Sequence, residues 1–290
     1  MSKDESGYFV PKKRLARFMS GLAMNNQEGV YLYGSGDPSI RELLPPPLEL
    51  FSPESPMVYV YIVNIREPSF GSWYMEGGIG TLASYREQIG MYFFNVQLSG
   101  PGALMGLLVG RESAGLPKKL CEAIVVERTD TYGHCCIDRN GVRLVDIELE
   151  IGHYNDPSYH ADAENCREAE EGMVLEGGCL LHKYGVNAET GVDALELISY
   201  DSPTRYYTWE PASATVHLGS SIDDPWADIP LRSVYGAGWS VCDNWINGTS
   251  VLYQYPKDEA ADAMQHLFTG RYDRGMLGER HQQYDSKQIS

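Results

Sequence analysis

Two adjacent lysines, Lys118 and Lys119, have the surroundings best suited to covalent chemistry in this sequence. They follow an apolar run, Ala103–Val109, that predicts a strand, and Pro117 directly precedes them. Neighbouring side chains of a strand point to opposite faces, and a proline bends the chain by fixing φ. Either geometry lets one ammonium group enter a closed cavity. Spacing alone favours the alternative, a solvated pair at a strand end, because lysines are rarely buried.

A lysine inside an apolar cavity acquires a specific reactivity. Desolvation disfavours the charged ammonium, and a neighbouring cation acts in the same direction. The neutral amine can then attack a carbonyl carbon and form a Schiff base, whose iminium form stabilises the enamine left after bond cleavage or proton loss. The segment from Gly110 to Leu120 is therefore the candidate catalytic region.

The elements that must position this segment are mostly strands. Short apolar segments separated by Gly, Pro, Asn and Asp are typical of antiparallel β-structure. Asn140-Gly141 is the strongest hairpin signal. Strands are predicted at 57–63, 91–98, 103–109, 123–127, 145–151, 180–184, 194–200, 204–209, 213–218 and 253–255, and helices at 12–23, 39–44 and 257–268. The acidic segment 161–172 predicts an exposed helix or loop.

This succession has no βαβ rhythm, internal repeat or low-complexity linker. It predicts a mainly β (α+β) protein, a single-domain antiparallel β-barrel or sandwich with flanking helices. We divide the chain into an N-terminal lead-in (1–29), the β domain (30–272) and a polar C-terminal tail (273–290).

Composition excludes several classes of protein. The net charge of −17, from 40 acidic and 23 basic residues, repels phosphates and anionic lipids. No apolar run is long enough to span a bilayer, and the charged N-terminus is unlike a signal peptide. We therefore expect a cytoplasmic protein without nucleic-acid or membrane partners.

Motifs for cofactors are also missing. None of the six cysteines has C-x-x-C spacing, so free thiols are expected. The sequence contains no H-E-x-x-H, Walker loop, complete G-x-G-x-x-G or G-x-S-x-G motif. Because these motifs are missing, we expect the protein to use no metal and no organic cofactor.

Several segments together resemble the acetoacetate decarboxylase family. They are the R-E-x-x-x-x-P-K-K-L pattern that starts at Arg111, the stretch from Tyr33 to Leu50, Tyr74-Met75-Glu76, the Asn140-Gly141 hairpin and Asp228-Ile229-Pro230-Leu231. The likeness covers roughly residues 30–255. It implies a cone-like β-barrel with surrounding helices, assembled as a homo-oligomer.

The resemblance also implies roles for individual residues. Lys118 is similar to the Schiff-base lysine, and Lys119 to the second lysine, whose charge favours the neutral form of the first. Glu76 is similar to the acidic group that lines the cavity and relays protons. Tyr74 is expected either to project into the same site or to pack in the core.

Two positions depart from the family pattern. Asn26 stands where the decarboxylases carry an arginine suited to a substrate carboxylate, and an amide cannot replace that charge. Tyr61 stands where the family has a second cavity glutamate. Both are expected to contact substrate, in a cavity that is more aromatic and less charged than one built for a small β-keto acid.

Three hypotheses for function follow. The first is a cofactor-independent lyase that decarboxylates a β-keto acid or related ketone through a Lys118 iminium and enamine. The second is a Schiff-base aldolase or dehydratase acting on a larger keto-acid or aromatic substrate without decarboxylation. The third is a non-catalytic barrel that binds a small molecule between aromatic side chains, with Tyr235 as a candidate lining residue.

Overall fold

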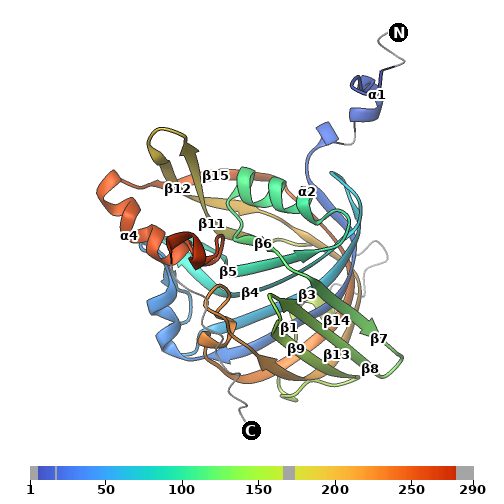
Figure 1. The fold of residues 1–290 in the computed structure, drawn as a ribbon. Helices are drawn as coiled ribbons and strands as arrows, with labels where there is room; N and C mark the ends of the chain where they lie inside the picture. The colour runs from blue at the N-terminus through green and yellow to red at the C-terminus, as the bar shows by residue number, and fades with distance from the viewer. Residues whose placement is uncertain (1–5, 17, 166–173, 279–290) are drawn as a thin grey trace.

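The computed structural model describes residues 6–16, 18–165 and 174–278, most of them in strands (Figure 1). The strands are β1 Ala23–Gly36, β2 Glu49–Leu50, β3 Met57–Pro68, β4 Tyr74–Tyr85, β5 Gln88–Ser99, β6 Lys118–Leu120, β7 Ala123–Arg128, β8 Tyr132–Arg139, β9 Val142–Ile151, β10 Val174–Leu175, β11 Gly178–Asn187, β12 Gly191–Asp201, β13 Thr204–Leu218, β14 Leu231–Trp245 and β15 Gly248–Gln254. The helices are α1 Lys12–Leu15, η2 Phe18–Ser20, η3 Pro38–Leu43, α2 Ala103–Leu107, η4 Leu108–Glu112, α3 Asp162–Asn165, η6 Trp226–Asp228, α4 Lys257–Leu267 and η7 Arg274–Leu277.

All of the strands belong to one curved sheet, shown in Figure 1. Its main order is β15-β12-β11-β5-β4-β3-β1-β14-β13-β9-β8-β7, and β2, β6 and β10 pair with β4, β5 and β13. Pairing is antiparallel except where β5 meets β6 and β11. Within the described ranges the end strands β15 and β7 do not pair, so the sheet is not closed. The mainly β class is confirmed, and a closed barrel is not.

Strand alternation separates two faces of the sheet. On β1 and β3, Val30, Leu32, Val60 and Ile62 face a buried hydrophobic core that also contains Ile137 of β8. The residues between them, among them Tyr31, Tyr33, Tyr59 and Tyr61, face a second cluster on the other side. Because side chains of a strand alternate, one strand can line both the core and a cavity.

The prediction of a strand at Ala103–Val109 is wrong, since these residues form α2 and the start of the π-helix η4. Ala103, Gly106, Leu107 and Gly110 are its buried residues, at the i, i+3, i+4 and i+7 spacing of a helix. Ala, Leu and Met are also strong helix formers. An all-apolar run can form either element, and this one packs as a helix.

Most other predicted elements are present with shifted ends. Strands β3, β5, β7, β9, β11 and β12 and helix α4 match their predicted segments, and the two segments predicted within 204–218 are one strand, β13. Asn140 and Gly141 both have positive φ in the β8–β9 hairpin, as predicted. The segment 39–44 forms a 3-10 helix, and the helix predicted from residue 12 ends at Leu15. The acidic segment 161–172 lies partly outside the described residues.

Three long strands were not predicted: β1, β4 and β14. Glycines interrupt their apolar patterns, for example Gly77, Gly78 and Gly80 in β4. Strand β1 begins at Ala23, inside the proposed 1–29 lead-in, and the division into lead-in, domain and tail stays a prediction.

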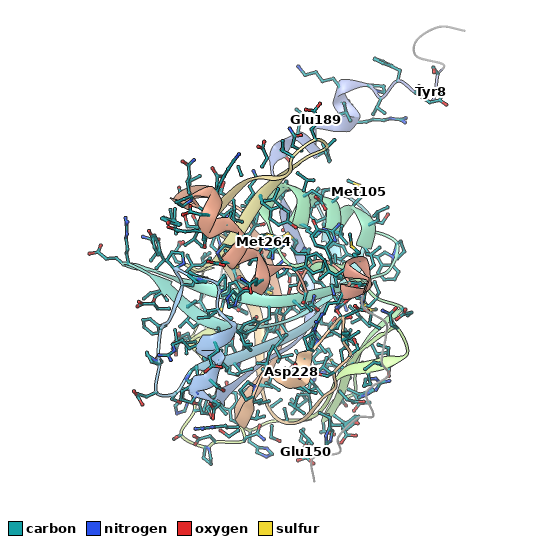
Figure 2. The ribbon with its side chains drawn as sticks, turned by 60° about the vertical axis from the view of Figure 1, so that its left-hand side comes forward. Tyr8, Met105, Glu150, Glu189, Asp228 and Met264 are labelled. Carbon is teal, nitrogen blue, oxygen red and sulfur yellow. The ribbon has the colours of Figure 1, made fainter. Side chains whose placement is uncertain are left out.

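Helices α2 and α4 lie toward one end of the molecule (Figure 1). Met105 of α2, Met264 of α4 and Glu189, in the β11–β12 turn, lie toward this end, opposite Glu150 of β9 (Figure 2). In the described ranges, no helix combines the length and apolar character needed to cross a bilayer.

Candidate active site

A row of paired residues crosses four strands and ends at Lys118. Tyr61 of β3 pairs with Gly78 of β4, Gly78 with Val96 of β5, and Val96 with Lys118 of β6. Because directly paired residues share a face, Tyr61 and Lys118 point to the same side. A Cβ at Gly78 would lie only 2.8 Å from Tyr61 Cε1 and 3.0 Å from a Val96 methyl. Glycine is therefore needed at this position, because a larger residue would clash with the Tyr61 ring and the Val96 side chain.

Lys118 and Glu76 form a buried acid–amine pair on this face. Glu76 precedes Gly78 by two residues on β4, so the two share a side of the strand. Lys118 Nζ donates a hydrogen bond to Glu76 Oε2 over 2.6 Å, and the Tyr61 hydroxyl donates to Oε1 over 2.7 Å. Only 6% of the lysine side chain and 11% of the glutamate side chain are exposed. A proton can therefore pass between amine and carboxylate without solvent.

The α2–η4 helical segment covers the Lys118 side chain. Lys118 Nζ lies 3.5 Å from the Gly106 carbonyl oxygen, and a Cβ at Gly110 would lie 2.8 Å from the same nitrogen. Arg111 Nη1 donates to the Lys118 carbonyl oxygen over 3.2 Å and to that of Arg271 over 3.1 Å. Short π-helical turns often occur at functional sites. Here the turn places the Gly110 backbone, which carries no side chain, against the Lys118 amine. It also places the Arg111 guanidinium against the Lys118 main chain.

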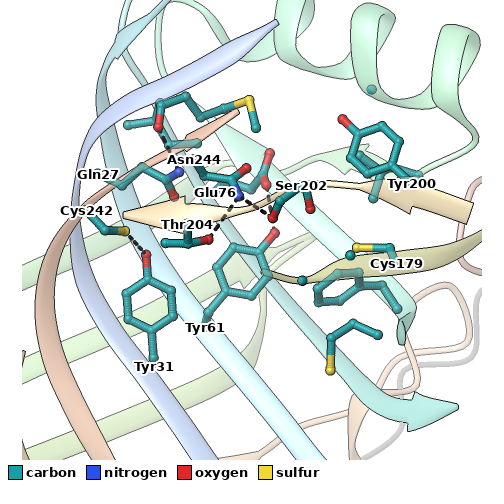
Figure 3. Close-up of a pocket in the computed structure, with 18 of the residues that line it drawn as sticks. Gln27, Tyr31, Tyr61, Glu76, Cys179, Tyr200, Ser202, Thr204, Cys242 and Asn244 are labelled. Atoms are coloured by element: carbon teal, nitrogen blue, oxygen red, sulfur yellow. Dashed lines mark hydrogen bonds between the residues drawn. The ribbon is translucent and has the colours of Figure 1, made fainter. Parts of the chain in front are cut away.

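The amine opens into a cavity of about 290 Å³, much of it lined by aromatic rings. The Tyr61 ring stacks on Tyr59 with centroids 5.8 Å apart, and Phe93 meets it edge-on at 5.6 Å. Figure 3 shows Tyr61 and Tyr31 side by side beneath Glu76. Aromatic rings supply a large apolar contact area. The cavity therefore suits an apolar ligand better than a highly charged one.

Charges in the cavity are few. Lys118 is the only Lys or Arg among the described lining residues, and the acids are Glu76 and Glu176. Burial, and then the adjacent Glu76 carboxylate, raise the pKa of Tyr61 well above its usual value, so this phenol stays neutral. Burial also raises the pKa of the Cys179 thiol to about 12. A protonated thiol is a poor nucleophile, which leaves the Lys118 amine as the nucleophile best placed in the cavity.

No metal centre accompanies this pair in the part of the chain that the structure describes. There, no group of three or more His, Cys, Asp or Glu side chains has a geometry that could hold a metal ion. His134, which adjoins Cys135 and Cys136 in the sequence, contacts the Asp146 carboxylate over 2.9 Å.

Lys119 points to the other side of β6, as strand alternation predicts. Its Nζ donates to the Asp223 carbonyl oxygen over 2.6 Å and lies 3.2 Å from one carboxylate oxygen of Asp224 and of Asp273. Arg139 contacts the same two aspartates. Lys119 does not line the cavity, and two carboxylates surround its charge. The role implied by the family resemblance, a cation acting on Lys118, receives no support from this geometry.

Lys119→Ala is instead expected to destabilise the fold. Removing one partner leaves the fully buried Asp224 carboxylate with Arg139 as its one cation and the neutral Gln97 amide as a donor among the described residues, and breaking a buried ion pair costs about 3 kcal/mol. Urea unfolding measures this loss, and Lys183→Ala, at an exposed lysine, serves as the control. Equal stability of the two variants would contradict the assignment.

The structure brings only some of the predicted substrate contacts together. Tyr61 lines the cavity. Tyr74 packs in the surrounding core, fully buried, and its hydroxyl has no hydrogen-bond partner among the described residues. Tyr235 lies outside the cavity, where its ring stacks on Tyr159 with centroids 5.8 Å apart.

Asn26 is also placed away from the cavity, which corrects the sequence expectation. The β1–β14 register shifts between Met24 and Gln27, and Asn26 occupies this bulge with φ at 51°. Its side chain donates to Glu67 over 3.3 Å. A bulge changes which side chains face inward, and Gln27 lines the cavity instead.

The other tyrosines and the polar residues of the cavity wall were not predicted from the sequence. Tyr31 and Tyr33 on β1 pair directly with Tyr61 and Tyr59 on β3. Their spacing of two residues is a detectable signal for one face of a strand. Gln27, Thr204 and Asn244 carry no comparable signal, because they meet only through the pairing of β1, β14 and β13.

Comparisons with known proteins place this geometry in context. The sequence model of acetoacetate decarboxylase (ADC) matches residues 8–256. A CLA biosynthesis isomerase from Lactiplantibacillus plantarum is 30% identical over 281 residues, which cover 94% of this chain and 96% of that relative. An acetoacetate decarboxylase from Burkholderia mallei is 24% identical over 80% of this chain and 88% of that relative. The crystal structure of acetoacetate decarboxylase from Legionella pneumophila has a similar fold, with a TM-score of 0.68, 16% identity, and coverage of 81% of this chain and 88% of that one.

Proposed function

Because this chain belongs to the acetoacetate decarboxylase family, we propose that Lys118 forms a Schiff base with a ketone and that Glu76 moves protons on the bound substrate. The reaction that the cavity favours is isomerisation of an apolar, unsaturated ketone. The single observation that carries this proposal is the 2.6 Å contact between Lys118 Nζ and Glu76 Oε2 in a largely aromatic cavity.

The proposed steps use groups already in contact. Glu76 takes a proton from the Lys118 ammonium, and the free amine adds to the ketone. Glu76 then returns this proton to the departing hydroxyl, so water leaves, an iminium ion forms, and the carboxylate is restored. A carboxylate near that iminium can remove a proton from the adjacent carbon, which gives a dienamine when a double bond follows. Returning the proton to the far end of the dienamine shifts the double bond into conjugation. Hydrolysis then releases the product and restores Lys118.

Isomerisation fits this cavity better than decarboxylation. Both reactions use the iminium as an electron sink, but decarboxylation of a β-keto acid also requires a carboxylate beside the reacting carbon. No second cation lines the cavity among the described residues to bind that group, and Glu176 would repel it. The name of the Lactiplantibacillus plantarum relative, an isomerase, agrees with this preference.

Three measurements test the proposal. Borohydride reduction in the presence of ketones should give a stable adduct on Lys118, located by peptide mass. A β,γ-unsaturated ketone should develop the absorbance of its conjugated isomer. Acetoacetate should release little carbon dioxide. Absence of any adduct across a broad panel of ketones would overturn the imine proposal and leave the alternative of a non-catalytic binding protein. Rapid carbon dioxide release would favour the decarboxylase.

Glu76→Gln is expected to separate imine formation from proton transfer. The amide cannot accept the substrate proton, so exchange of α-hydrogens in deuterated water should slow by about 100-fold or more. NMR measures this exchange directly, while borohydride still labels Lys118. Glu67→Gln is the matched control, since Glu67 lies on β3 outside the cavity. An unchanged exchange rate in Glu76→Gln would show that another group moves the proton.

A further inference from the structure

A group of uncharged polar side chains forms one wall of the cavity. Gln27, Thr204 and Asn244 line it, near the ends of β1, β13 and β14 (Figure 3). On β14, Asn244 pairs with Met24 and Thr204, and the neighbouring Cys242 pairs with Gln27. Strand pairing therefore holds these side chains together on the cavity face. The proposed reaction uses none of them.

Gln27 presents an amide oxygen to the cavity without a donor from the described residues. The residue is 7% exposed, and its Nε2 donates to the Met24 carbonyl oxygen over 2.9 Å. This bond directs the nitrogen to the protein, and no hydrogen bond to Oε1 occurs among the described residues. This oxygen is not among the enclosed side-chain atoms that lack a partner, so it is reached from the cavity, where it can accept a hydrogen bond. A ligand that offers a donor would therefore be stabilised here.

Asn244 is oriented in the same way. Its Nδ2 donates to the Ser202 and Pro203 carbonyl oxygens, over 3.0 and 3.1 Å, and to Thr204 Oγ1 over 3.0 Å. These bonds occupy the nitrogen and leave Oδ1 without a donor in the part of the chain that the structure describes. Because Thr204 Oγ1 accepts a hydrogen bond, its own proton is free to be donated.

The ligand group that suits this wall both donates and accepts hydrogen bonds. A hydroxyl can donate to an amide oxygen of Gln27 or Asn244 and accept from Thr204. A carboxylate can only accept, so it would face two amide oxygens and the nearby Glu176 without a cation to balance it. A purely apolar group would leave the amide oxygens unpaired.

We propose that Gln27, Thr204 and Asn244 form a subsite for a hydroxyl group carried by the ketone substrate, at a distance from the carbonyl that Lys118 binds. This assignment rests on the proposed function, since it takes Lys118 as the ketone-binding group. The substrate class is thus a neutral hydroxy-ketone with an apolar chain between its two functional groups.

The test compares 2-alkanones with their ω-hydroxy counterparts over a series of chain lengths. Borohydride adduct yield on Lys118 of the wild-type protein, against ketone concentration, gives the apparent affinity. At the chain length that reaches from Lys118 to the subsite, the hydroxy-ketone should bind about 10-fold more tightly than the alkanone of the same length. Calorimetry with Lys118→Ala, which cannot form the imine, gives the same comparison for non-covalent binding.

Gln27→Leu should remove this preference, and Thr204→Val should reduce it. Gln254→Leu, the same change at an exposed position of β15, is the control and should retain it. Equal affinity for both ketones at every chain length, or a preference that persists in both cavity variants, would overturn the subsite. Adducts without a hydroxyl preference reject the subsite alone. A calorimetric preference without adducts rejects the Schiff base and keeps the subsite.

Discussion

Lys118→Ala is expected to abolish the borohydride-trapped adduct and to lower ketone turnover by at least about a thousandfold. Among the described lining residues no other lysine is present, and burial raises the pKa of the Cys179 and Cys242 thiols to about 12, which keeps them protonated. No other described lining residue therefore offers a comparable nucleophile. Peptide mass after reduction and the initial rate of isomerisation are the two measurements.

Lys119→Ala is the matched control for this experiment. Lys119 is adjacent in sequence but points to the Asp224 and Asp273 carboxylates rather than into the cavity. Under conditions where this variant stays folded, the adduct on Lys118 should form as in the wild type. An adduct that survives Lys118→Ala and disappears in folded Lys119→Ala would contradict this prediction, because the nucleophile would then be Lys119, on the other side of β6.

Gly110→Ala is expected to lower the rate of adduct formation by about 100-fold without unfolding the protein. The added methyl would lie 2.7 Å from Lys118 Cδ and Cε and 2.8 Å from Nζ. The lysine chain is flexible, so it would move aside, and a displacement of about 1 Å in a reacting group costs about that factor. The free energy of unfolding should stay within about 1 kcal/mol of the wild-type value, because alanine is favoured over glycine in a helix.

Gly71→Ala tests whether this effect is specific to the amine. A Cβ at Gly71 meets only ordinary contacts, the nearest being Met105 Cβ at 3.5 Å. Adduct formation should therefore keep its wild-type rate in this variant. Wild-type rates in both variants would show that the π-helical turn does not position Lys118. A large loss of stability in Gly110→Ala would show that the backbone, and not the lysine, yields to the methyl.

Much of the fold was predictable because its signals are local. The alternation in β9, the Asn140-Gly141 turn and the amphipathic α4 each depend on residues close in sequence. The apolar run 103–109 was not predictable from periodicity, since a buried helix and a buried strand can have the same composition. Strands β1, β4 and β14 were missed because their glycines disrupt the apolar pattern and are explained only by close neighbours, such as the Tyr61 ring beside Gly78.

The candidate site likewise combines features that local sequence determines with features that strand pairing determines. The Pro117-Lys118-Lys119 segment and its opposite-facing lysines follow from sequence order, because neighbouring residues of a strand must diverge. Which lysine reaches the cavity depends on the pairing of β6 with β5, and Glu76 joins it only because β4 pairs with β5 as well. The bulge at Asn26, which turns Gln27 inward, arises from a register shift between β1 and β14. The opposite directions of the two lysines are thus determined locally, whereas the burial, the acid partner and the ligand wall of Lys118 come from residues distant in the chain, which only strand register brings together.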